Sequence, residues 1–257
     1  MNVKLDSNLI GQYHSASQTA RILTESWVAD NMFCPRCGCK NIKHFENNRP
    51  VADFYCPSCM AEYELKSKKG TIEHKINDGA YDTMIKRIVS NNNPDFFFMN
   101  YSIETLTVKD FLLVPKHFFV PEIIEKRKPL STTARRAGWT GCNILLDQIP
   151  TQGRIAIIRD GVCQPVKTIT EKLNKSQKLA TDNITTRGWL LDILNCVNSI
   201  QSDNFTLNDM YGFEDILQAR HADNHNVKAK IRQQLQILRD KGYIEFRGKG
   251  MYKINKK

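Results

Sequence analysis

Two closely spaced cysteine pairs constrain this chain more than any other feature of its sequence. The motifs CPRC and CPSC each place two cysteines three positions apart, and eighteen residues separate the motifs. Such turns direct four thiolates at one point, where zinc completes a tetrahedral shell of sulfurs at ~2.3 Å. We therefore predict a structural Zn2+ site with the ligands Cys34, Cys37, Cys56 and Cys59.

Two alternatives to this ligand set are open. A pair of disulfides would need an oxidising compartment, which nothing in the sequence indicates. Cys39 could replace Cys37 as a ligand, although this would break the two-residue spacing. We interpret the remaining cysteines, Cys142, Cys163 and Cys196, as small buried hydrophobic residues.

The charge balance favours a polyanionic partner. The chain holds 37 Lys and Arg against 27 Asp and Glu, a net charge of +10. Residues 226–257 alone contain ten Lys and Arg against two acidic residues. Long-range attraction and the release of condensed counterions would draw such a segment to nucleic acid. A basic protein without such a partner is the alternative that charge alone leaves.

Composition excludes disordered, fibrous and membrane-spanning classes. With 257 residues, of which 41% are hydrophobic and 25% charged, the chain can bury an ordinary core in one or two domains. Its apolar stretches fall far short of the ~20 residues of a membrane helix, and its start lacks the pattern of a targeting signal. We expect a cytoplasmic monomer that has no membrane association and no obligate protein partner.

The first part of the chain has the pattern of a mixed α/β domain. Helices are expected at residues 15–32 and 78–91, the latter followed by the stop signal NNNP. Strands are expected at residues 51–56, 60–67, 96–102, 107–114 and 154–161. Residues 171–187 are polar and lack an apolar period, so we interpret them as a linker between domains at residues 1–180 and 181–257.

The C-terminal region has the pattern of a winged helix. A helix at 188–200 is followed by a second helix that Thr206 caps, with Asp209 three residues further on. A third helix at 227–241 ends before a glycine, and the segments YIEF, RGKG and MYKI then predict a strand, a tight turn and a strand.

Polar side chains on the third helix surround an apolar stripe, which we expect to be buried. The stripe consists of Val227, Ile231, Leu235 and Leu238. A winged helix places this element in the major groove, where Gln pairs with adenine and Arg with guanine, while the wing meets phosphates. We predict DNA contacts at Lys228, Lys230, Arg232, Gln233 and Gln236, and on the wing at Arg247 and Lys249. Ordinary solvated charges are the alternative.

The hairpin around CPSC carries a candidate catalytic group. If the two cysteines flank the turn, Asp53 lies opposite Glu62, with Glu64 on the diagonal. Side chains alternate along a strand, so Glu62, Glu64 and Lys66 share one face, away from Tyr63. We therefore expect Asp53, Glu64 and Lys66 to converge.

This group suits hydrolysis of a phosphodiester. Two carboxylates, Asp53 and Glu64, with the carbonyl of Leu65 make an oxygen-rich site for Mg2+. Lys66 could orient or deprotonate a water while the metal stabilises charge on the phosphate. Glu62 is a reserve ligand, and Glu25 on the first helix could assist, although an exposed helix glutamate is more common.

A second DNA-contact candidate is the basic segment KRKPLSTTARRAGWTG at residues 126–141. Arg135 and Arg136 could hold the DNA backbone, and Trp139 beside a glycine could wedge or stack at DNA. The alternative is that Trp139 fills the core.

A carboxylate followed by E-x-K on the next strand is the skeleton of the PD-(D/E)xK nucleases. Longer blocks resemble, over essentially the whole chain, the DpnI family of methyl-directed type II restriction endonucleases: HFENNRPVADFYC, EYELKSKKG, INDGAY, NNNPDFFFMNY, RKPL, TARRAGW, GCNI and IRQQLQILRDK. The family pattern matches Asp53, Glu64 and Lys66. It also matches the four cysteines of CPRC and CPSC, the two motifs that we call the first and second knuckle. Pro50 departs from the wider superfamily pattern, because it lies three residues before Asp53 rather than next to it.

The resemblance implies a PD-(D/E)xK restriction-endonuclease-like core with a four-Cys structural zinc site and a C-terminal winged-helix domain. It also implies Mg2+-dependent cleavage of double-stranded DNA at GATC sites whose adenine is methylated, with both domains binding the site. Two other functions are alternatives to this one. One is a zinc-containing winged-helix regulator without catalysis, and the other is a structure-selective repair nuclease.

Overall fold

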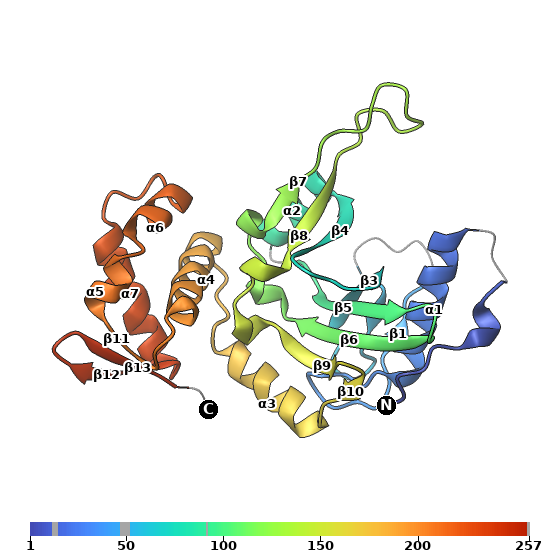
Figure 1. The fold of residues 1–257 in the computed structure, drawn as a ribbon, viewed down its shortest axis with the longest axis horizontal. Coiled ribbons are helices and arrows are strands. Elements are labelled where there is room, and N and C mark those ends of the chain that lie inside the picture. The colour runs from blue at the N-terminus through green and yellow to red at the C-terminus, as the bar shows by residue number, and fades with distance from the viewer. Residues whose placement is uncertain (12–14, 47–51, 91, 256–257) are drawn as a thin grey trace. The chain divides into compact units, whose positions relative to one another are not determined.

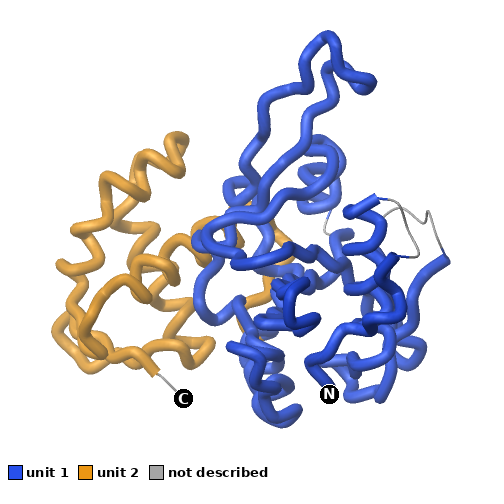
Figure 2. Tube along the Cα trace, turned by 45° about the vertical axis from the view of Figure 1, so that its right-hand side comes forward, with its two compact units in different colours: residues 1–177 blue, residues 178–257 orange. Residues whose placement is uncertain are grey.

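The computed structural model describes residues 1–11, 15–46, 52–90 and 92–255. Within them the chain forms two compact units, Met1–Gln177 and Lys178–Lys257 (Figure 2). Pro50 and Val51, the latter the start of a predicted strand, lie outside the described residues. In the described part, no helix combines the length and the apolarity needed to cross a bilayer.

A seven-stranded mixed sheet forms the centre of unit 1 (Figure 1). Its strand order is β1-β2-β3-β5-β6-β9-β10, where β3 and β5 are parallel and the other neighbours are antiparallel. The strands are β1 (Lys43–His44), β2 (Phe54–Tyr55), β3 (Glu62–Lys69), β5 (Asp95–Ser102), β6 (Thr107–Val114), β9 (Ile155–Arg159) and β10 (Val162–Cys163). The predicted mixed α/β architecture is confirmed.

Both faces of the large sheet are covered. Helices α1 (Ala16–Asn31) and α3 (Val166–Gln177) share one core cluster with alternate residues of β5, among them Phe97. The other face carries Phe96 and Phe98, and Phe96 packs against Phe119 with ring centroids 4.4 Å apart. Burial on both sides explains why β5 is an almost continuous apolar run rather than an alternating one.

A smaller sheet in the order β4-β8-β7 includes β4, which lies in the connection between β3 and β5. It contains β4 (Lys75–Ala80), β7 (Ile124–Lys126) and β8 (Gly141–Leu145), and helix α2 (Tyr81–Val89) follows β4. The predicted helix at 78–91 is therefore wrong at its start. Asp78 and Ala80 instead pair with β8, with a bulge at Gly79 between them, and Ile76 and Asp78 lie on the same, less exposed side of β4 in a pattern of period two.

Short 3-10 turns join several of these elements. They are η1 (Ser7–Leu9), η2 (Lys116–Phe118), η3 (Pro121–Ile123), η4 (Leu146–Gln148) and η5 (Thr151–Gly153).

The predicted linker at 171–187 is wrong at both ends, because residues 171–177 form the end of α3 and residues 184–187 form the start of α4 (Ile184–Ser199). The side chains of Ile169, Leu173 and Ser176 are buried at helical spacing. Ile169 precedes the predicted linker and Ser176 is polar. Leu173 is therefore the one apolar residue of the three inside 171–187, and no apolar period can be recognised there.

Unit 2 has the arrangement of a winged helix. Its elements are α4 (Ile184–Ser199), β11 (Asn204–Thr206), α5 (Leu207–Tyr211), α6 (Glu214–Arg220), α7 (Val227–Asp240), β12 (Ile244–Gly248) and β13 (Met251–Ile254). The last two strands and β11 form a sheet in the order β11-β13-β12. The strand β11 and the division of the second helix into α5 and α6 were not predicted.

The predicted cap and buried stripe of unit 2 are confirmed. The Thr206 hydroxyl accepts a hydrogen bond from the backbone N–H of Asp209, and the Asp209 carboxylate accepts one from the backbone N–H of Thr206. This reciprocal pair begins α5. On α7 the four apolar residues of the stripe are buried, together with Gln234.

Candidate metal centre, catalytic cluster and DNA-binding surfaces

The four predicted cysteines gather at one point of unit 1. Their sulfur atoms all lie within 4.8 Å of one another. Cys34 Sγ is 3.6 Å from Cys59 Sγ, and Cys37 Sγ is 3.5 Å from Cys56 Sγ. Four bonds of ~2.3 Å in a tetrahedron separate sulfurs by about 3.8 Å. All four are free of disulfides, so the donor set and its spacing fit a zinc ion.

Cys39 lies outside this cluster. Its thiol points to the backbone carbonyl of Asn41, at 3.7 Å, so Cys37 rather than Cys39 completes the group of four. Across the described residues, these cysteines are the one set of three or more Cys, His, Asp or Glu side chains close enough together to hold a metal ion.

The first knuckle is tied to the central sheet by a partly buried ion pair. Arg36, inside CPRC, contacts Asp95 at the start of β5 through Nε at 2.8 Å and Nη2 at 3.0 Å. The Asp95 carboxylate is 1% exposed and also accepts the backbone N–H of Lys116 at 2.9 Å. A bidentate pair of this kind sets the position of both partners.

The second knuckle forms a longer turn than its cysteine spacing suggests. The backbone N–H of Cys56 donates to the carbonyl of Ala61 at 2.8 Å, and Met60 inside the turn has a left-handed φ of 59°. The closing pair of the turn is therefore Cys56 and Ala61, not the two cysteines.

This turn changes the register of the hairpin. Phe54 pairs with Tyr63, and Tyr55 pairs with Glu62. The predicted register is thus wrong by two residues, because Tyr55 rather than Asp53 lies opposite Glu62. One further step along the same register brings Asp53 level with Glu64.

Glu64 and Lys66 of β3 lie together, as the alternation predicts. Lys66 Nζ is 2.5 Å from a Glu64 carboxylate oxygen, and it also contacts the carboxylate of Asp78 on β4. Arg87 of α2 lies 3.1 Å from the other Glu64 oxygen. None of these four side chains is more than 19% exposed. They form a partly buried network of two acids and two bases.

Burial and charge oppose each other in this network. Burial raises the pKa of Glu64, while the neighbouring Lys66 and Arg87 act to lower it. Burial acts to lower the pKa of Lys66, but the carboxylates of Glu64 and Asp78 outweigh it and raise the pKa of the ammonium group. Lys66 is therefore held in its charged form by two acids.

Asp53 approaches the same strand from its edge. One carboxylate oxygen accepts a hydrogen bond from the backbone N–H of Leu65 at 2.7 Å. Burial raises the pKa of Asp53, and this hydrogen bond and the charge of Lys66 both act against the rise. Asp53 is thereby attached to β3 at the residue that separates Glu64 from Lys66.

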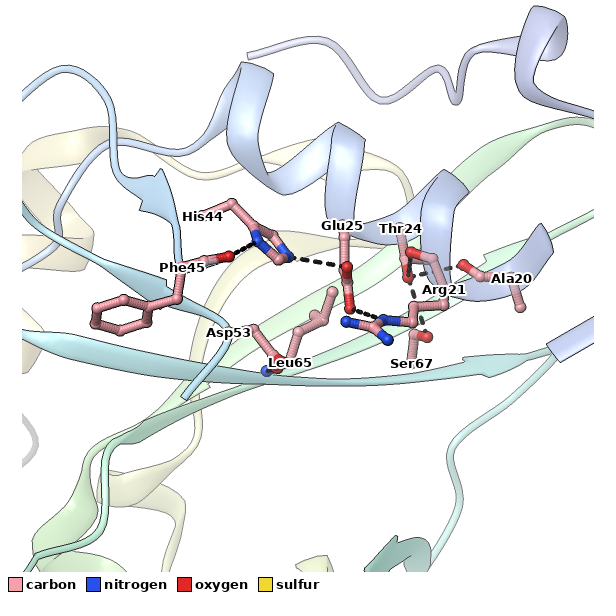
Figure 3. A network of polar contacts seen from close by, with 9 residues as sticks. All are labelled: Ala20, Arg21, Thr24, Glu25, His44, Phe45, Asp53, Leu65 and Ser67. Carbon is pink, nitrogen blue, oxygen red and sulfur yellow. Dashed lines mark hydrogen bonds and ion pairs between the residues drawn. The ribbon is translucent and has the colours of Figure 1, made fainter. Parts of the chain in front are cut away.

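Helix α1 adds a second polar network beside Asp53 (Figure 3). Arg21 Nε donates to one oxygen of Glu25 at 2.7 Å, and His44 Nε2 lies 2.9 Å from the other. His44 also contacts the carbonyl of Phe45. The charges of Glu25 and His44 both act on the pKa of Asp53, in opposite directions. Glu25 is 16% exposed rather than an exposed helix glutamate.

Sequence reasoning missed Asp78, Arg87, Arg21 and His44. Asp78 was hidden by the helix predicted at 78–91. The available signal was an acid two residues after Ile76, on what proves to be the inward side of a strand. His44 gave no signal, because its partner Glu25 lies nineteen residues earlier in the chain.

The predicted basic segment forms a long hairpin loop between β7 and β8 that projects from unit 1 (Figure 1). Arg135 and Arg136 are exposed. Trp139 is only half-buried and does not belong to the core; its ring lies 4.6 Å from the Arg136 guanidinium. It also packs on the backbone of Gly141, where a Cβ would come within 2.8 Å of the ring.

The predicted residues of α7 and the wing differ in exposure. Arg232, Gln233 and Gln236 are exposed, and the Arg232 guanidinium donates to the Tyr211 hydroxyl at 2.6 Å. Lys228 forms an ion pair with Glu214 at 3.1 Å.

Three further predicted residues complete this set. Lys230 is half-buried, with Nζ 6.0 Å from the centre of the Trp189 ring. Arg247 and Lys249 are exposed on the wing, where Arg247 pairs with Glu245 at 2.9 Å.

Comparison with known families divides the chain close to the boundary between its two compact units. A model described as DpnI, Dam-replacing family, matches residues 1–182. A second model, described as DpnI_C, Dam-replacing HTH domain, matches residues 185–254, which cover α4 to β13. HTH denotes the helix-turn-helix, a DNA-binding motif. The chain therefore belongs to the DpnI, or Dam-replacing, family and carries that family's helix-turn-helix domain at its C-terminal end.

Proposed function

We propose that this protein is a methyl-directed type II restriction endonuclease. It cuts both strands of double-stranded DNA at GATC sites with methylated adenine, in a reaction that depends on Mg2+. The family membership supports a restriction enzyme with a DNA-binding helix-turn-helix domain. The observation that carries the chemistry is the contact of Glu64 with Lys66 on β3, with Asp53 hydrogen-bonded to the backbone between them.

The donor set suits a hard divalent cation. The side chains of Asp53 and Glu64 and the backbone carbonyl of Leu65 offer oxygen ligands only, which is what Mg2+ prefers. When bound there, Mg2+ supplies positive charge that stabilises the negative charge developing on the phosphate. These ligands and Lys66 are what the proposed PD-(D/E)xK nuclease requires.

The residues of the chain have separate tasks in this proposal. Lys66 donates hydrogen bonds to the attacking water and orients it toward the phosphorus. Asp53 is kept in place by the Leu65 N–H, and Glu64 by Lys66 and Arg87. The zinc knuckles contribute rigidity, because the turn at Cys56 joins β2, which Asp53 directly precedes, to β3, which carries Glu64.

DNA is recognised by two surfaces. In unit 2, Gln233, Gln236 and Arg232 on the exposed side of α7 are suited to base edges in the major groove. In unit 1, the projecting loop offers Arg135 and Arg136 to the DNA backbone and the half-buried Trp139 to a base step. Two recognition surfaces in one chain allow the site to be read twice without a second protein, as expected of a monomer.

The test compares plasmid DNA with and without adenine methylation at GATC. We expect double-strand cleavage of the methylated plasmid when Mg2+ is present and none when it is omitted. Sequencing the ends would locate the cut. Tight binding without cleavage would instead identify a DNA-binding regulator, and cleavage of branched or nicked DNA regardless of methylation would identify a repair nuclease. Either result overturns the proposal.

A further inference from the structure

Lys66 has two acidic partners, although the proposed reaction assigns a task to only one of them. Glu64 is a proposed metal ligand, and its two oxygens contact Lys66 and Arg87, so a bound Mg2+ would compete with Lys66 for this carboxylate. Asp78 contacts the same ammonium group and is absent from the predicted catalytic set. Its side chain is 6% exposed, so its burial beside Lys66 calls for a reason.

Strand pairing and a backbone hydrogen bond fix the position of Asp78. Asp78 pairs with Cys142 on β8, and a bulge at Gly79 shifts the register immediately after it. The Asp78 carboxylate also accepts the backbone N–H of Gly79 at 2.6 Å. A bulge leaves one residue unpaired and re-aims its neighbours, which is a common device beside active sites. Here the backbone N–H of Gly79 and the Lys66 ammonium group meet the same carboxylate oxygen, Oδ1, so the hydrogen bond holds in place the atom that the lysine contacts.

Water cannot fully replace the carboxylate partners of Lys66. Its side chain is 19% exposed, and a buried ammonium group needs an anionic partner. If Asp78 were neutral, Glu64 would be the single anion on the ammonium group among the contacts described. Mg2+ and Lys66 would then compete for the same carboxylate.

We propose that Asp78 is a positioning residue that acts through Lys66. It holds the lysine in place while Glu64 is released to the metal ion, so that both can serve the reaction at once. This inference rests on the proposed nuclease function. It assigns Asp78 no contact with substrate or metal.

The direct test is a double-mutant cycle on metal binding. Mn2+, a paramagnetic substitute for Mg2+, is titrated alone into the zinc-loaded protein, and the free ion is measured by electron paramagnetic resonance. The proteins are wild type, Asp78→Asn, Lys66→Met and the double variant. Asparagine keeps an oxygen for the Gly79 N–H and removes only the charge.

We expect Asp78→Asn to weaken Mn2+ binding about tenfold, within the usual range for coupled sites. In the Lys66→Met background the same change should have no effect, because no lysine then competes for Glu64. An equal loss in both backgrounds would mean that Asp78 attracts the cation directly, and this result would overturn the proposal. No loss in either would overturn it as well.

Two further variants distinguish a loss of lysine positioning from a general loss of folding. Asp78→Glu keeps the charge and should bind Mn2+ more tightly than Asp78→Asn; equal weakening in two folded variants would contradict the proposal. Asn77→Ala changes the neighbouring exposed residue of β4 and should match wild type. Thermal unfolding of each variant shows whether it is folded, and Asp78→Glu supplies the test if Asp78→Asn is not.

Cleavage of methylated plasmid by the wild-type protein keeps the two ideas apart. If wild type does not cut, the nuclease function fails, and the inference about Asp78 fails with it. If wild type cuts and the Mn2+ cycle shows no coupling through Lys66, only the inference fails. In an active enzyme, Asp78→Asn should also raise the Mg2+ concentration for half-maximal cleavage without weakening DNA binding.

Discussion

The hydroxyl of Tyr63 lies 3.1 Å from the sulfur of Cys34. Tyr63 is fully buried on β3 directly before Glu64, and its ring stacks on Phe97 with centroids 4.8 Å apart. Tyr63 therefore connects the first cysteine knuckle to β3, the candidate catalytic strand. Because packing in a protein core transmits strain, disorder at the cysteines would reach Glu64 within one residue.

This contact leads to a prediction about zinc. Cys56→Ala removes one thiolate and should lower or abolish zinc content, loosen the hairpin and abolish cleavage. Structural zinc contributes folding free energy directly, so the melting temperature should fall as well. Zinc content by atomic absorption, thermal unfolding and plasmid cleavage measure the three effects. Cys39→Ala is the matched control and should behave as wild type, whereas full activity after zinc removal would contradict the prediction.

Replacing the charged pair on β3 should separate cleavage from binding. Glu64→Gln and Lys66→Met should each reduce the cleavage rate by about 10²-fold or more, the scale of a general acid–base or electrostatic contribution. DNA binding by the winged helix should remain, because α7 belongs to the other compact unit. Single-turnover cleavage and gel-shift affinity on the same methylated duplex check this, and Glu62→Gln serves as the comparison. Loss of binding in parallel with cleavage would argue against separate tasks.

The two kinds of DNA contact predicted in unit 2 should respond differently to mutation. Lys249→Ala on the wing should weaken binding to all sequences alike and reduce the salt dependence of binding by about one charge. Gln233→Ala on α7 should instead reduce discrimination between GATC and altered sites, by about 1–3 kcal/mol for a base contact. Titrations of matched duplexes at several salt concentrations distinguish the two patterns. Identical effects of both variants would show that neither reads a base.

The cap of α5 should make unit 2 sensitive to acid. The backbone N–H and hydroxyl of Thr206 hold the pKa of Asp209 below its ordinary value of 3.8. Since the folded-state pKa is the lower one, the stabilisation is present above about pH 4 and is lost as the pH falls through the folded-state value. Asp209→Asn should therefore lower the melting temperature of the winged helix near neutral pH, with the difference from wild type shrinking below pH 4.

Thermal unfolding of the full chain, followed by a probe in unit 2, tests this expectation. Asp223→Asn, an exposed loop aspartate of the same unit, is the matched control. A difference between Asp209→Asn and wild type that stays constant from pH 7 to pH 3 would contradict the ionic contribution of the cap.

Local spacing was sufficient for much of this molecule. Two C-x2-C motifs identified the four cysteines that gather at one point, because each turn sets the direction of its own sulfurs. Residues 227–240 were recognisable as a helix with its buried stripe, since a 3.6-residue period is written within one segment. Alternation along β3 likewise placed Glu64 beside Lys66.

Tertiary structure decided what no single segment contains. The register of the candidate catalytic hairpin goes with a turn in which Met60 adopts a left-handed conformation, and this register brings Asp53 level with Glu64. Asp78 and Arg87 reached the site only because β4 pairs with β8 and α2 follows it. Short-range periodicity is a property of the chain, whereas strand pairing and ion-pair partners arise from contacts between residues far apart in sequence. The sequence by itself therefore determined which residues could act, and the tertiary structure determined which of them meet.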